Sequence, residues 1–88
     1  METKRLSGTN LIITGAASGI GRASALRFAQ DGATVILLDR NQQGLEETQS
    51  LLSAQSTPET PLRASHFTID LTDEYAVKEA VETSARIW

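Results

Sequence analysis

Cysteine is absent from this sequence of 88 residues, and histidine occurs once, as His66. Without cysteine the chain can form no disulfide bond, no thiolate nucleophile and no thiolate metal site. A single histidine cannot build a zinc site alone. These absences predict that the chain has no metal centre, and they favour a reducing, cytoplasmic setting.

The sequence also lacks a basic block and a long hydrophobic run. Eight lysines and arginines against eleven acidic residues give a net charge of -3, which argues against nucleic acid or an anionic membrane surface as a partner. The longest apolar run, Val35–Leu38, is far too short to span a bilayer, and Met1–Ser7 is too polar for a signal segment. We therefore expect a soluble protein without a nucleic-acid or membrane partner.

Three segments have the patterns of β-strands. Leu11–Thr14 and Thr34–Leu38 are apolar on consecutive positions, as in strands that are buried on both faces of a parallel sheet. Ser65–Leu71 alternates between apolar and polar side chains, which predicts a third strand with one apolar face. Its polar face indicates a place toward the edge of the sheet.

Each predicted strand is followed by a helical pattern. The first helix is expected over Ile20–Gln30, with Gly32 beyond it as a C-terminal cap. A second, polar helix begins at Asn41, and a loop with two prolines, Ser56–Pro61, follows it. Thr72 is the predicted N-cap of the last helix, in which apolar and small residues recur at helical spacing.

Three successive β-α pairs predict an α/β fold. With right-handed crossovers they form half of a Rossmann-type, doubly wound domain, in which three parallel strands lie in the order 3-2-1 with helices on both faces. No stretch after the loop with the prolines is long enough for a second core. Residues 1–88 are therefore interpreted as one incomplete nucleotide-binding domain.

The most informative motif is Thr-Gly-Ala-Ala-Ser-Gly-Ile-Gly at 14–21, between the first strand and the first helix. Gly15 permits a tight turn, Gly19 lets the backbone approach a pyrophosphate, and Gly21 allows the helix to pack closely on the sheet. Free amides and the dipole at the helix start favour a phosphate charge. A glycine turn without a ligand is the alternative, but the strand-to-helix setting favours a phosphate site.

Asp39 follows the second strand, where a carboxylate can accept both hydroxyls of an adenosine ribose and repel a 2′-phosphate. This position predicts NAD as the cofactor in preference to NADP. Arg40 leaves two possibilities open, because its guanidinium could pair with a 2′-phosphate or lie over the adenine ring. A solvated turn pair is the other interpretation of the two residues, and the nearby glycine loop favours cofactor binding.

The motif Thr-Gly-x-x-x-Gly-x-Gly, with Leu6 and Gly8 just upstream, resembles the start of the short-chain dehydrogenase/reductase family. The similarity extends over nearly the whole chain. It implies that the glycine loop binds the phosphates of a nicotinamide cofactor, with a backbone amide from Ile20. Many family members that prefer NADP have a basic residue where this chain has Ser18, so this position also indicates NAD.

The segment Asp70–Asp73 resembles the family's motif after the third strand, where the acid and the next residue's backbone contact the adenine. Asp and Thr are also ordinary residues at a helix start, so both interpretations stay open. The predicted cofactor contacts are then those of the glycine loop, the second strand's end and the third strand's end: Gly15, Ser18, Gly19, Ile20, Gly21, Asp39, Arg40, Asp70 and Leu71.

No residue of the chain is assigned a catalytic role. Tyr75 and Lys78 are three residues apart, whereas the family's catalytic tyrosine and lysine are four apart and come much later. His66 lies on the polar face of its predicted strand without an evident carboxylate or serine partner, so we interpret it as solvated or structural.

The family's Asn-Asn-Ala-Gly motif on the fourth strand and its catalytic serine, tyrosine and lysine have no counterpart here. The chain is therefore expected to be an N-terminal fragment, truncated before the fourth strand and inactive alone. The resemblance implies a homo-oligomeric parent that transfers hydride between NAD(P) and a carbonyl carbon. A stand-alone nucleotide-binding or interaction module is the alternative, and the open edge of the first strand predicts self-association.

Overall fold

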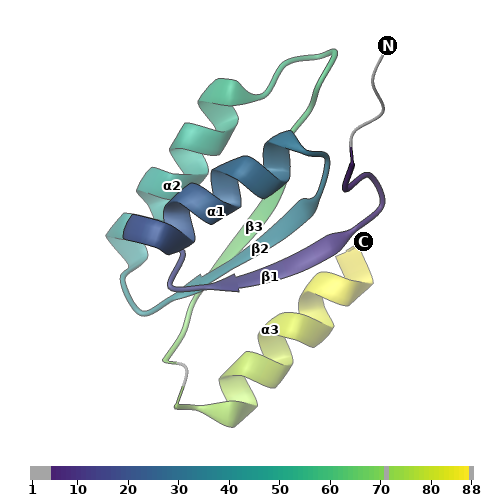
Figure 1. Cartoon of the computed structure of the whole chain (residues 1–88). Helices are drawn as coiled ribbons and strands as arrows, with labels where there is room; N and C mark the ends of the chain where they lie inside the picture. The colour runs from purple at the N-terminus through teal and green to yellow at the C-terminus, as the bar shows by residue number, and fades with distance from the viewer. Residues whose placement is uncertain (1–4, 71, 88) are drawn as a thin grey trace.

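The structure is a computed structural model that describes residues 5–70 and 72–87. It contains three strands and three helices in strict alternation, which are, in chain order, β1 (Asn10–Thr14), α1 (Gly19–Gln30), β2 (Thr34–Asp39), α2 (Gln42–Gln55), β3 (Arg63–Thr68) and α3 (Glu74–Ile87). The strands form one parallel sheet in the order β1-β2-β3, with β2 in the middle. Helices α1 and α2 cover one face of this sheet, and α3 lies on the other (Figure 1). The predicted α/β class, strand order and two-sided helix cover are confirmed.

β2 is the centre of the core because its side chains are buried in both directions. Val35 and Leu37 pack with the residues of α1 and α2, whereas Ile36 and Leu38 pack with Ala80 of α3. The consecutive apolar residues of this strand therefore face two separate hydrophobic clusters, as the run of four predicted.

β1 differs from this prediction. Its inner residues Leu11 and Ile13 pack against the cluster under α1, but Ile12, on the face of α3, is 47% exposed. The expectation that this strand is buried on both faces was wrong for the described chain. The physical reason is the position of β1 at the sheet edge, where α3 leaves Ile12 partly uncovered.

β3 lies at an edge of the sheet and has one apolar face, as predicted. Phe67 and Ile69 pack toward α3, but Ala64 packs against the opposite cluster, so both faces of the strand are covered. His66 is half-buried, and its Nδ1 lies 3.1 Å from Oε1 of Gln49 on α2. The polar face is nevertheless covered by α2 at His66, which is the structural rather than the solvated histidine.

The start of α3 was predicted one residue too early. Asp73, rather than Thr72, precedes the helix, and its carboxylate accepts a hydrogen bond from the backbone amide of Ala76 at 3.1 Å. The Thr72 hydroxyl instead donates to Asp70 at 2.8 Å. Within the described part of the chain no helix is long and apolar enough to cross a membrane, and the cytoplasmic setting stays a prediction.

Candidate functional site

The loop between β1 and α1 has a backbone that requires glycine. Gly15 and Gly19 have φ angles of 67° and 56°, in the left-handed region that side chains disfavour. A Cβ at either position would meet open space. At Gly21 the constraint is steric instead, because a Cβ there would collide with the carbonyl oxygen of Gly15. The first turn of α1 thus lies directly against the start of the loop.

The beginning of α1 is open to solvent. Ser18 is at the N-cap position with an extended backbone, and its side chain makes no capping hydrogen bond. The side chain of Ile20 is 87% exposed. The first amides of an α-helix have no partner within the helix, and together with the helix dipole they attract an anion. This end of the helix could therefore hold a phosphate group.

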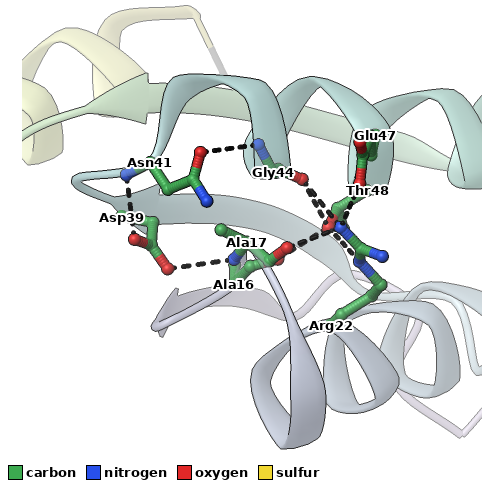
Figure 2. Close-up of polar contacts among 8 residues, drawn as sticks. All are labelled: Ala16, Ala17, Arg22, Asp39, Asn41, Gly44, Glu47 and Thr48. Atoms are coloured by element: carbon green, nitrogen blue, oxygen red, sulfur yellow. Dashed lines mark hydrogen bonds and ion pairs between the residues drawn. The ribbon is translucent and has the colours of Figure 1, made fainter.

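Asp39, the last residue of β2, connects this strand to the loop (Figure 2). One carboxylate oxygen accepts a hydrogen bond from the Ala17 amide at 3.1 Å, and the other accepts from the Asn41 amide at 3.0 Å. Partial burial raises the pKa of Asp39, but hydrogen bonds from the backbone of Asn41, Ala17 and Arg40 together lower it by more than burial raises it. The pKa of this carboxyl is therefore below its ordinary value. The carboxylate is thus ionised and fixed beside the loop.

Asp70 lies at the same edge of the sheet, after β3. The Ile69 amide donates to the Asp39 carbonyl at 2.9 Å, which continues the pairing of the two strands to this point. Hydrogen bonds from the Thr72 amide and hydroxyl lower the pKa of Asp70, and the charge of Arg40 lowers it further. Asp70 thus lies after the strand next to the one that Asp39 ends, and the charge of Arg40 reaches it, whereas Leu71 lies outside the described residues.

Two residues that the sequence interpretation left out hold the loop on the side that faces α2. Arg22 of α1 donates to the Ala17 carbonyl at 2.5 Å, and the buried Thr48 of α2 donates to the Ala16 carbonyl at 2.7 Å. Figure 2 shows both side chains between the loop and α2. These contacts join residues far apart in the sequence. A glycine inside a predicted helix, Gly44, was the one signal of close packing here.

The fold and the site together define half of a Rossmann-type α/β domain. Its parallel sheet has a glycine loop that leads into an exposed helix start, and acidic residues lie at the ends of the neighbouring strands. The sequence model of the short chain dehydrogenase family matches residues 9–88, and the chain belongs to this family. The resemblance that the glycine motif indicated is confirmed, and the family is one of oxidoreductases.

Individual relatives agree with this assignment. The chain is 40% identical over 78 residues to a 3-oxoacyl-(acyl-carrier-protein) reductase of Thermotoga maritima, an alignment that covers 89% of this chain and 30% of that protein. The structure of the present chain is similar to that of carveol dehydrogenase from Mycobacterium avium in complex with NAD. The TM-score is 0.83, with 30% identity, and the match covers 96% of this chain and 33% of the dehydrogenase.

A second solved structure has the other nicotinamide cofactor. L-Sorbose reductase from Gluconobacter frateurii, complexed with NADPH and L-sorbose, matches with a TM-score of 0.74 and 31% identity over 93% of this chain and 30% of that one. Relatives with this fold thus bind either NAD or NADPH. The chain spans about a third of the length of these relatives.

Proposed function

We propose that the chain is the cofactor-binding part of an NAD-dependent short-chain oxidoreductase. The observation that carries the proposal is the position of the Asp39 carboxylate, fixed within hydrogen-bond distance of the loop whose glycines Gly15 and Gly19 have left-handed backbones and open space beside them. Family membership supports the redox chemistry. NAD, when bound, accepts or donates the hydride, and the residues of this chain bind and orient it.

The phosphates are proposed to bind at the loop of residues 15–21. Its glycines leave room for a ligand at Gly15 and Gly19, and the amides at the start of α1, including those of Ser18 and Ile20, point from a helix end that has no side-chain cap. Gly21 serves the site indirectly, because it lets α1 approach the loop.

The adenosine half is proposed to lie across the ends of β2 and β3. An ionised carboxylate offers about four lone-pair positions, and the amides of Ala17 and Asn41, at 3.1 and 3.0 Å, occupy about half of them. The remainder can accept the two ribose hydroxyls. Arg40, Asp70 and the backbone of Leu71 are proposed to contact the adenine, and the effect of the Arg40 charge on the pKa of Asp70 supports a shared site.

No catalytic residue is proposed among the 88, and the chain alone is predicted to show no dehydrogenase turnover. Hydride transfer to or from a carbonyl carbon, the identity of the substrate and a homo-oligomeric assembly are proposed for the longer protein, as they are for the family. The chain's own contribution is the binding and orientation of the dinucleotide.

The proposal is tested by calorimetric titration of NAD into the chain and into two glycine variants. Gly19→Ala and Gly8→Ala both place a Cβ on a backbone with positive φ and open surroundings, so their backbone strain is similar. Gly8, however, lies before β1, at the opposite end of the strand from the loop. We expect Gly19→Ala to weaken NAD binding and Gly8→Ala to leave it unchanged, and equal effects of the two would contradict the site.

A further inference from the structure

The loop contains two successive peptide units whose orientation is fixed by side chains on the side of α2. Ala16 and Ala17 are 0% and 2% exposed, so their backbone groups need partners inside the protein. The Ala16 amide donates to the Leu38 carbonyl at 3.3 Å, and the Ala17 amide donates to the Asp39 carboxylate at 3.1 Å. Both carbonyls of these alanines point instead toward α2, as Figure 2 shows.

Thr48 satisfies the first of these carbonyls. Its side chain is completely buried, and its hydroxyl donates to the Ala16 carbonyl at 2.7 Å while it accepts from Nε of Arg22 at 2.9 Å. The peptide between Ala16 and Ala17 is therefore held at both ends, by Thr48 at its oxygen and by Asp39 at its nitrogen.

Arg22 satisfies the second carbonyl. One terminal nitrogen of its guanidinium donates to the carbonyls of Ala17 and of Gly44, at 2.5 and 3.1 Å, and forms an ion pair with Glu47 at 3.1 Å. Gly44 allows this approach, because a Cβ there would lie 2.6 Å from the Cβ of Ala17. The guanidinium thus joins the loop directly to the backbone of α2.

The orientation of these carbonyls determines where the next amide points. The chain has no cis peptide among its described residues, and in a trans peptide the carbonyl and the N–H point in opposite directions. When Arg22 holds the Ala17 carbonyl toward α2, the amide of Ser18 in the same peptide is directed away from α2. That is the open side of the loop, where Gly15 and Gly19 leave space.

We propose that Arg22 and Thr48 are positioning residues for the cofactor's phosphates. Arg22 directs the Ser18 amide toward the ligand by holding the Ala17 carbonyl against α2. Thr48 keeps Arg22 and the preceding peptide in place, because its hydroxyl accepts from the guanidinium and donates to the Ala16 carbonyl. Neither side chain touches the cofactor in this account. The proposal rests on the proposed function, because it assumes that the loop binds phosphate.

The test compares ADP with adenosine, which share the adenine and ribose but differ in the diphosphate. Thr48→Val removes the hydroxyl with little change of shape, and Thr48→Ser restores it. Arg22→Lys keeps the charge but not the planar fork that reaches several acceptors, and it provides a milder variant if the valine variant does not fold. Glu47→Gln, which removes only the ion-pair partner, is the control.

Binding constants of the chain are measured by NMR titration at a temperature where each variant is folded. Because each variant leaves a loop carbonyl without its donor, ADP affinity should fall by about fivefold to tenfold in Thr48→Val and Arg22→Lys. Adenosine affinity should stay unchanged in both. Thr48→Ser and Glu47→Gln should bind ADP as the wild type does.

A merely structural role would lower the melting temperature without separating the two ligands. Wild-type ADP affinity in both variants, or an equal loss of ADP and adenosine affinity, would overturn the assignment of Arg22 and Thr48 while leaving the proposed function intact. Failure of the wild-type chain itself to bind ADP would overturn the proposed function, and this inference with it.

Discussion

Asp39 has two kinds of partner in this account, the backbone amides of the protein and the ribose of the proposed cofactor. Its folded-state pKa is lowered, so the stability that its carboxylate contributes is fully present above the unfolded-state pKa of about 4 and is lost as the pH falls through the lower folded-state value. The hydrogen bonds to Ala17 and Asn41 weaken over the same acid range, since protonation removes the charge that strengthens them.

Replacement of Asp39 with asparagine should therefore reduce the acid sensitivity of the fold. Thermal unfolding at a series of pH values between neutrality and pH 3 provides the measurement. The wild-type melting temperature should fall more steeply below about pH 4 than that of Asp39→Asn. Glu59→Gln, in the exposed loop before β3, controls for the loss of one charge. Parallel pH profiles for wild type and Asp39→Asn would show that the carboxylate does not stabilise the loop.

The same residue governs the predicted choice of cofactor. A carboxylate fixed beside the ribose should repel a 2′-phosphate, so the affinity for NAD should be at least about tenfold higher than the affinity for NADP. Asp39→Ala should reduce this discrimination but also removes the partner of Ala17, whereas Asp39→Asn removes the charge and retains an acceptor. Titration with both cofactors decides the point. Tighter binding of NADP by the wild type would mean that Arg40 outweighs Asp39.

At this scale the sequence was informative where spacing alone determines geometry. The left-handed backbone of Gly15 and the close approach at Gly21 follow from a glycine motif between a strand and a helix, and Asp39 from its place after the next strand. The contacts of Arg22 and Thr48 with the loop were not predictable. They depend on how α1 and α2 pack together, and no local pattern distinguishes a buried helical threonine from an exposed one.

Among the elements, the contact of α2 with the loop depends on a single glycine. A Cβ on Gly44 would lie 2.6 Å from the Cβ and 2.7 Å from the carbonyl oxygen of Ala17. Gly44→Ala should therefore lower the free energy of unfolding by about 1–3 kcal/mol, although alanine is the better helix former. Ser50→Ala, on the exposed side of α2, is the control and should be close to neutral. Thermal or urea unfolding would expose an error if Gly44→Ala proved as stable as Ser50→Ala.

The strands differ in how well their surroundings could be predicted. β2 was predicted correctly because a central strand must be apolar in both directions. β1 has the same kind of sequence but lies at the edge of this sheet, where Ile12 remains half-exposed. In β3 a period of two predicted one apolar and one polar face, and the sequence did not indicate that α2 covers the polar face through Gln49 and His66. Periodicity reports which side chains are apolar, whereas tertiary packing decides which faces are covered.

For the whole molecule, the surface that most affects its assembly is the edge of β1 that faces away from β2. No strand pairs with this edge among residues 5–70 and 72–87. An unpaired strand edge with partly exposed apolar residues and without an internal proline or lysine invites pairing with another chain. The 88-residue chain is therefore predicted to be weakly stable and to self-associate.

Sedimentation and thermal unfolding at several protein concentrations test this prediction. Ile12→Lys places a charge on the exposed face of β1 and should reduce association, whereas Leu51→Lys, which changes an exposed apolar residue of α2, should not. A monomer with a sharp transition that is independent of concentration would overturn the prediction and favour a stand-alone module.

The central claim, that the loop between β1 and α1 binds the cofactor, is tested most directly by an NMR titration of the labelled chain with NAD. The account predicts saturable shifts that are largest for the amides of residues 15–21, with further shifts at Asp39, Arg40 and Asp70. Shifts that never saturate, or that cluster on the outer face of α2 and leave the glycine loop unaffected, would contradict it.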